Sequence, residues 1–177
     1  MELLYHVTKD DSVLGSIERS NAHLDQILHR AGMIFLARSD GKILLQRRSS
    51  SNKIFPNCWD SSSSFHVTFG ESYDQAARRE LREETGVSAL FEYLGKGLVS
   101  CPPPENEIVA VFSCKSDDSI RFDQAESSEA SFHTRDEVSV MARSQAAAPW
   151  FGRGWRLLAT RLFPHDNQET DTDPRSE

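Results

Sequence analysis

Alternating runs of apolar and polar residues predict where the chain forms strands. Two apolar runs, at 32–38 and 42–48, are separated by Ser-Asp-Gly, which predicts a β-hairpin closed by an Asp-Gly turn. The runs at 107–115 and 129–134 predict two further strands, and the segment 54–67 is expected to be part loop and part strand. These runs supply enough strands for a sheet.

The segment 72–85 has the sequence features of a helix. Ser72 and Gln75 have the spacing of a capping box, in which each side chain bonds the backbone N–H of the other residue. Gly86 follows the segment, and glycine commonly ends a helix because it adopts a left-handed backbone without strain. We therefore expect the helix to begin and end at these residues.

Two more helices are predicted in the last third of the chain. Thr134 and Glu137 form a second capping-box pair, which opens a short helix, and Pro149 begins a longer one. The polar, acidic segment 164–177 has no apolar anchor and is expected to be disordered. Strands mixed with three helices predict an α/β or α+β sandwich, as a single domain over residues 1–163.

The composition limits the classes of partner. The chain has 177 residues and a net charge of −7, whereas a general nucleic-acid-binding protein needs a basic face. No apolar run approaches the roughly 20 residues that span a bilayer, and the first residues lack the features of a signal peptide. Three cysteines without a CxxC pair fit a reducing compartment, so the cytoplasm is the expected location.

Three glutamates crowd the end of the predicted helix 72–85. On a helical wheel Glu84 falls inside the apolar stripe that contains Ala77 and Leu81, Glu80 lies at its edge, and Glu83 lies beyond Glu80. A buried carboxylate without a partner is very costly, so it is protonated, paired with arginines or bound to a cation. Hard divalent cations prefer carboxylate oxygens. The alternative is a solvated acidic face balanced by the arginines of the same helix.

The spacing of these acids resembles the Nudix box. That pattern is Gly, five residues, Glu, seven residues, Arg-Glu-aliphatic, one residue, Glu-Glu, one residue, Gly-aliphatic. The positions that agree are Glu71, Arg79, Glu80, Leu81, Glu83, Glu84, Gly86 and Val87. The first glycine is replaced by Phe65, which puts in doubt the backbone carbonyl that this glycine lends to the metal in the family.

The resemblance implies a Nudix α/β/α sandwich with a mixed central sheet and metal-assisted hydrolysis of a diphosphate linkage. Mg²⁺ or Mn²⁺ would be the cofactor and a small organic diphosphate the substrate. Glu83 and Glu84 would be the main metal ligands, with Glu71 as a further one. Glu80 would bind metal or accept the proton of the attacking water, and the sequence does not separate these two roles.

Over roughly residues 5–160 the chain also looks like the Nudix branch that contains isopentenyl-diphosphate isomerase. That enzyme has a metal site of histidines and a Glu-x-Glu pair, and the resemblance places its ligands at His29, His66, Glu105 and Glu107. His23 is a weaker match, because its separation from His29 differs by one residue. Glu107 also stands at the acid/base glutamate of the isomerase.

The chain departs from the isomerase at two positions that matter for its chemistry. Ser64 stands where the isomerase has its essential cysteine, and a hydroxyl is far less acidic than a thiol. Glu80 stands where the isomerase has an arginine that grips the diphosphate. Trp155 stands where a tryptophan shields the cationic intermediate, with core packing as the alternative.

These departures favour hydrolysis over isomerisation. Four basic residues lie where the isomerase branch places diphosphate contacts or near them: Arg19, Arg47, Arg48 and Lys53. An isomerase-like protein and a non-catalytic nucleotide-binding Nudix module are the alternatives. The particular diphosphate is left open, and so is the oligomeric state, with a homodimer as one option.

Overall fold

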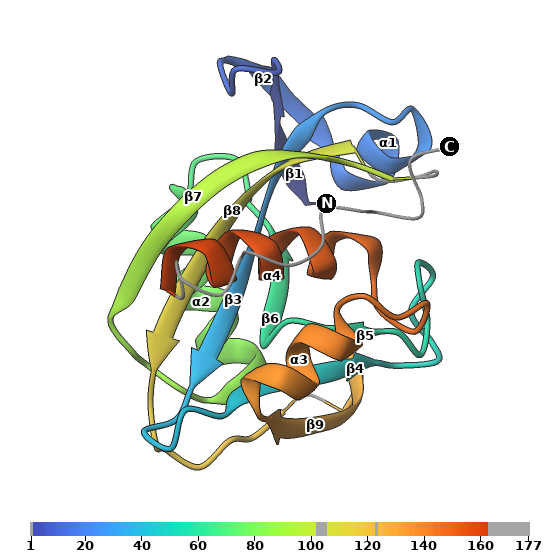
Figure 1. The fold of residues 1–177 in the computed structure, drawn as a ribbon. Helices are drawn as coiled ribbons and strands as arrows, with labels where there is room; N and C mark the ends of the chain where they lie inside the picture. Colours follow the sequence, from blue (N-terminus) through green and yellow to red (C-terminus); the bar gives the residue numbers. More distant parts are fainter. Residues whose placement is uncertain (1, 102–105, 123, 163–177) are drawn as a thin grey trace.

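A mixed β-sheet with helices on both faces makes up the computed structural model, which describes residues 2–101, 106–122 and 124–162 (Figure 1). The strands are β1 (Leu3–Val7), β2 (Val13–Glu18), β3 (His29–Ala37), β4 (Ile43–Arg48), β5 (Trp59–Asp60), β6 (Ser63–His66), β7 (Phe91–Ser100), β8 (Asn106–Lys115) and β9 (Ser127–His133). The helices are α1 (Arg19–Leu24), α2 (Tyr73–Thr85), α3 (Arg135–Met141) and α4 (Pro149–Leu162). The predicted α/β class with a mixed central sheet is confirmed.

Strand β3 lies at the centre of the sheet. It pairs in parallel with β8 along its whole length, beginning at His29 opposite Glu107. On its other edge it pairs antiparallel with β6, where Ala31 lies opposite His66. These two ladders bring two of the predicted metal-binding histidines and Glu107 to the same end of the sheet.

The predicted hairpin between the first two apolar runs is wrong beyond its turn. The turn forms, because the Gly41 N–H donates to the carbonyl of Arg38 at 3.0 Å. The ladder, however, contains only the pair Ala37–Ile43, after which β4 pairs with β9 and β5. A strand has two edges, and those of β3 are taken by β6 and β8, so β4 diverges from β3.

Two hydrophobic cores lie on the two faces of the sheet. Along β3 the side chains alternate, so Met33 and Phe35 face one core while Ile34 and Leu36 face the other. Figure 1 shows α4 crossing in front of β7, β8 and β3, with α2 behind the sheet. Buried residues of α2 complete one core, and buried residues of α3 and α4 complete the other.

Helix α2 has the ends that the sequence predicts. The Ser72 hydroxyl accepts from the Gln75 N–H at 3.2 Å, and the Ser72 N–H donates to the Gln75 side chain at 2.8 Å. Gly86 ends the helix with φ of 74°, in the left-handed region. The capping box of α3 at Thr134 also forms.

Two further expectations from the sequence concern the tail of the chain and membrane-spanning segments. The predicted disordered tail 164–177 lies outside the described residues. Among the helices that are described, none has both the length and the apolar character needed to cross a membrane.

Candidate functional site

A cavity of about 410 Å³ lies where β3 and β4 separate. Its walls come from nine described elements and the loops next to them, including Gly32 on β3, Gln46 and Arg48 on β4, and His66 on β6. Glu80 and Glu84 of α2, His23 of α1 and Glu107 of β8 also line it. The divergence of the hairpin strands therefore creates the space in which the box glutamates meet the histidine cluster.

Glu84 occupies the position of a core residue. It is 9% exposed, and Gln46 Nε2 donates to its Oε2 at 3.1 Å. Burial raises the pKa of Glu84 well above its usual value, and the nearby carboxylates of Glu80 and Glu126 raise it further, while Ser63 and Gln46 oppose the rise. A cation bound here would offset both the burial and the like charges.

The arginine of the box, Arg79, binds the other acids of the box, and Glu84 is not among its described partners. Arg79 donates to both oxygens of Glu71, at 2.8 and 2.9 Å, and to Glu80 at 2.6 Å. It also reaches Glu83 at 3.3 Å, where the Glu83 side chain is 56% exposed. Glu80 and Glu84 thus line the cavity, whereas Glu71 and Glu83 are not among its lining residues.

Burial also raises the pKa of Glu80, since its side chain is only 19% exposed. The ion pair with Arg79 opposes this rise, while the carboxylates of Glu83 and Glu126 add to it. Two neighbouring carboxylates with raised pKa values face one cavity.

Three histidines form a triangle beside this carboxylate pair. Ring centroids lie 5.1 Å apart for His23 and His29, 5.0 Å for His23 and His66, and 5.2 Å for His29 and His66. One nitrogen from each ring lies within 4.8 Å of the others. The Oε1 atom of Glu107 lies 3.2 Å from His66 Nε2 and 3.4 Å from His29 Nε2. His23, the weaker match in the sequence, is therefore a full member of the cluster.

The charge states within the cluster are set by burial and by each other. Burial lowers the pKa of His23 to about 4, helped by the two neighbouring imidazoles, and burial also lowers the pKa of His66. Burial alone would raise the pKa of Glu107, but His29 and His66 outweigh it and hold this pKa below its usual value. His23 and His66 are thus neutral near pH 7, which is the form of imidazole that binds metals.

The predicted phosphate-binding residues divide into two pairs. Arg19 and Arg48 line the cavity, Arg19 with an ion pair to Glu2 at 2.9 Å. Arg47 and Lys53 are exposed and are not among the lining residues. Glu105 lies outside the described residues, so its place relative to the cluster is not described.

Asp60 is a wall residue that the sequence reasoning missed. It is 3% exposed and accepts from Ser64 Oγ at 2.8 Å and from Trp150 Nε1 at 2.9 and 3.0 Å. Arg48 Nη1 lies 3.4 Å from Asp60 Oδ2, and its guanidinium lies over the Trp150 ring at 5.3 Å. Asp60 follows a tryptophan in a serine-rich segment, so no local pattern marked it.

Gln46, Ser127 and Glu126 also line the cavity and were missed. Glu126 lies near Glu80 and Glu84, where its charge raises both pKa values. These three residues lie outside the box, on β4, on β9 and just before β9. Only the tertiary fold brings them to α2.

Phe65 is accommodated without backbone strain. It lies in β6 opposite Gly32 and is absent from the described residues with positive φ. Its ring packs over Gly32, where a Cβ would lie 2.4 Å from the ring. The doubt raised by the missing glycine therefore does not extend to the backbone conformation.

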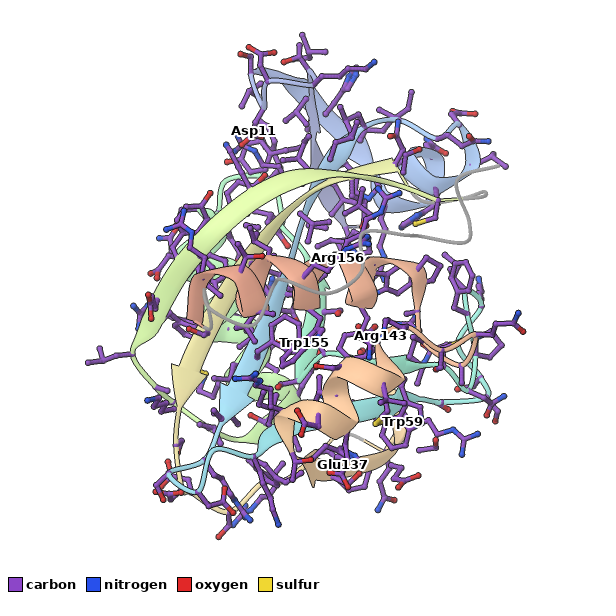
Figure 2. The ribbon with its side chains drawn as sticks, in the orientation of Figure 1. Asp11, Trp59, Glu137, Arg143, Trp155 and Arg156 are labelled. Atoms are coloured by element: carbon purple, nitrogen blue, oxygen red, sulfur yellow. The ribbon has the colours of Figure 1, made fainter. Side chains whose placement is uncertain are left out.

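Trp155 belongs to the core, which is the alternative reading from the sequence. It is 4% exposed, packs on Phe35 with ring centroids 5.8 Å apart, and donates to Ser139 Oγ at 3.1 Å (Figure 2). Among the residues that line the cavity, the tryptophan is Trp150.

The residues present fit divalent cations in two places. Glu80 and Glu84 offer desolvated carboxylate oxygens, which hard cations such as Mg²⁺ and Mn²⁺ prefer. The histidine triangle with Glu107 offers nitrogen and oxygen ligands, the set expected for a transition metal or Mn²⁺. Both places open on the same cavity.

A mixed sheet between helices, with buried carboxylates beside a group of histidines at one cavity, defines an α/β protein whose cavity gathers side chains of the types that bind cations. The NUDIX domain family model matches residues 27–152. The uncharacterized Nudix hydrolase PA4841 of Pseudomonas aeruginosa is 34% identical over 151 residues, or 84% of this chain and 88% of that protein. The chain therefore belongs to the Nudix hydrolase family.

Other comparisons agree on the fold and include the isomerase. An isopentenyl-diphosphate Delta-isomerase of Salmonella heidelberg is 30% identical over 162 residues, or 85% of each chain. The crystal structure of DR0079 from Deinococcus radiodurans superposes with a TM-score of 0.73 at 28% identity, covering 88% of this chain and 99% of that one. A MutT protein of Methanosarcina mazei superposes at 0.65 with 19% identity over 76% of this chain and 96% of that one, which shows the fold alone.

Proposed function

We propose that this protein is a metal-dependent hydrolase that cleaves the diphosphate linkage of a nucleotide-type or other small organic diphosphate. The observation that carries the proposal is the buried pair Glu80 and Glu84 in the same cavity as Arg19 and Arg48. Glu84 has no arginine among its described hydrogen bonds, so its charge is available to a cation. The arginines are placed to bind phosphate oxygens.

Each cavity residue has a role in this reaction. Glu84 and Glu80 would hold Mg²⁺ or Mn²⁺, which when bound neutralises phosphate charge and lowers the pKa of water. Arg48 is held by Asp60 and Trp150, so its guanidinium is fixed before substrate arrives. We assign proton acceptance from the attacking water to Glu80, because it lines the cavity beside Glu84 and burial raises its pKa, which makes it the stronger base.

The histidine cluster would hold a second divalent metal. His23 and His66 are neutral near pH 7, and His29 is oriented by Nδ1, which lies 2.8 Å from the Ile27 carbonyl. A backbone partner on one ring nitrogen leaves the other nitrogen for a ligand. Metal analysis of the purified protein tests this: His66→Ala should lose bound metal, while His6→Ala, at a half-buried histidine outside the cluster, should not.

Isomerisation of isopentenyl diphosphate is the second candidate, because the histidine cluster with Glu107 resembles the isomerase site and relatives carry that name. Two residues oppose it. Ser64 donates to Asp60 at 2.8 Å and offers a hydroxyl where the isomerase has a thiol. Glu80 replaces the arginine that grips the diphosphate in that enzyme.

One screen separates the candidates. The protein is incubated with Mg²⁺ or Mn²⁺ and a panel of nucleoside diphosphate derivatives and prenyl diphosphates, with phosphate release and isotopically labelled isopentenyl diphosphate as readouts. We expect phosphate or a phosphomonoester to form, and EDTA to abolish the reaction. Turnover in excess EDTA would overturn metal dependence. Conversion of labelled isopentenyl diphosphate would favour the isomerase, and binding without turnover would favour a nucleotide-binding module.

A further inference from the structure

Gln46 makes three hydrogen bonds in the wall of the cavity. It is 4% exposed on β4, 38 positions before Glu84 in the chain. Its Nε2 donates to the carbonyl of Ser62 and to Glu84 Oε2, the latter at 3.1 Å. Its Oε1 accepts from the hydroxyl of Ser127, the first residue of β9.

The chemistry of these partners allows only one orientation of the amide. The Ser62 carbonyl accepts and never donates, and an ionised Glu84 likewise only accepts. Both N–H groups of Gln46 are thereby used, and the remaining oxygen faces a hydroxyl that donates. A flipped amide would place its oxygen against two acceptors, so the amide cannot turn away from Glu84.

We propose that Gln46 is a positioning residue for Glu84 and that Ser127 holds Gln46 in place. This inference rests on the proposed function, in which Glu84 binds the catalytic cation. A single amide N–H engages Oε2 and directs the carboxylate into the cavity. An arginine in this place would compete with the cation for the charge of Glu84, whereas a neutral amide orients the carboxylate and leaves that charge available.

The partners of Glu84 differ from those of the other acids of the box, and the proposed role of Gln46 accounts for the difference. Arg79 binds Glu71, Glu80 and Glu83 but is not among the described partners of Glu84. Glu84, the most deeply buried of these acids, therefore accepts a hydrogen bond from a neutral donor on β4.

The test measures Mn²⁺ binding to the substrate-free protein by electron paramagnetic resonance, alongside kcat and KM. The Mn²⁺ equivalent that is lost in Glu84→Gln identifies the Glu84 site. We expect Gln46→Met, which keeps the size and removes the donor, to weaken Mn²⁺ binding at that site by about 10- to 100-fold. The value of kcat should fall with it, with little change in the KM of the diphosphate.

Ser127 supplies a second variant that keeps the proposal falsifiable. Ser127→Ala should weaken Mn²⁺ binding, by less than Gln46→Met does. Ser127→Thr should bind Mn²⁺ as the wild-type protein does, because the hydroxyl is retained. Ser128→Ala is the matched control, because Ser128 is the next residue of β9 and its hydroxyl donates to the carbonyl of Arg47, on β4, at 3.3 Å. Circular dichroism and thermal unfolding report whether each variant folds.

The outcomes distinguish this inference from the proposed function. If wild-type protein binds Mn²⁺ through Glu84 and turns over substrate while folded Gln46→Met does both equally well, the positioning role is overturned and the hydrolase stands. If Gln46→Met does not fold, unchanged Mn²⁺ affinity in Ser127→Ala overturns the role. If wild-type protein shows neither turnover nor Mn²⁺ binding that depends on Glu84, both proposals fail.

Discussion

At the scale of a single residue, Glu84 is a carboxylate in a position that would otherwise be apolar. Its neighbours on the helix, Ala77 and Leu81, are fully buried, and an apolar side chain at 84 would complete the same stripe. A carboxylate there carries a desolvation cost, which is visible in its raised pKa. In the proposed function a cation that binds Glu84 would offset this cost.

The first prediction separates function from folding at this residue. Glu84→Gln should lower kcat by roughly 10² to 10³, the range for the loss of one group that acts on the transition state. The free energy of unfolding should not fall, since the buried charge is removed and the shape is kept. Glu83→Gln, on an exposed side chain, should impair turnover less. Equal activity in Glu84→Gln and the wild-type protein would contradict the assignment.

At the scale of elements, the packing of β3 on β6 accommodates the change in the box. Phe65 stands at the position of the box glycine, and its neighbour across the ladder is Gly32. A Cβ added to Gly32 would lie 2.4 Å from the aromatic ring, closer than real contacts allow. The large residue on β6 therefore requires the small one on β3.

The second prediction is a coupling between these two strands. Gly32→Ala should lower the free energy of unfolding by about 1–3 kcal/mol, the cost of overpacking a dense interior. In a Phe65→Leu background the same change should cost less, because the ring that clashes is gone. Urea unfolding of the four proteins measures the coupling, with Gly97→Ala as a control position where a Cβ meets nothing within 4 Å. Additive effects would show that the two residues are independent.

At the scale of the whole molecule, an ion cluster around the buried Asp11 joins segments that are distant in the chain. Asp11 lies in the turn between β1 and β2, at the end of the molecule away from α3 (Figure 2). Arg30 Nε of β3 donates to it at 2.6 Å, and Lys96 of β7 and the Tyr73 hydroxyl of α2 also donate to it. The cluster joins the N-terminal hairpin to the central sheet and to the helix that carries the box.

The third prediction follows from the charge of this cluster. Burial alone would raise the pKa of Asp11, but Lys96 and Arg30 outweigh it and lower the pKa in the folded state. The pKa of an aspartate in an unfolded chain is about 3.9. The stabilisation is therefore present above about pH 4 and is lost as the pH falls through the lower folded value.

Asp11→Asn should lower the free energy of unfolding by about 1–3 kcal/mol at pH 7, because two cations keep a neutral partner in place of a carboxylate. The difference from wild type should shrink steadily below about pH 4. Glu92→Gln, an exposed acid on β7, should change stability by less than about 0.5 kcal/mol. A difference for Asp11→Asn that stays constant down to pH 2.5 would contradict this account.

The local features of the fold could be predicted from the sequence. The capping box of α2, its end at Gly86 and the burial of Glu84 follow from residues within one or two turns of each other. Such signals depend on near neighbours, and near neighbours in the chain stay near in space. The α/β class follows in the same way, from the number and type of these local elements.

The arrangement of the cavity could not be predicted from the sequence, because it depends on which of several distant strands pairs with β3. The hairpin turn at Gly41 was predictable, yet β6 displaces β4 from the edge of β3, and this opens the cavity. His23 was the weakest histidine by spacing, but α1 and β3 bring its ring to 5.1 Å from His29.

The sequence by itself determined the helix, the acid that the helix buries and the family of the chain. The tertiary structure alone decided that Gln46 and Ser127 support that acid, across separations of 38 and 81 residues along the chain. The physical reason is that the contact between Gln46 and Ser127 requires β4 to take β9 as its partner, a choice that is not local. That choice is the sum of many weak pairings over the whole sheet, and no short stretch of sequence contains it.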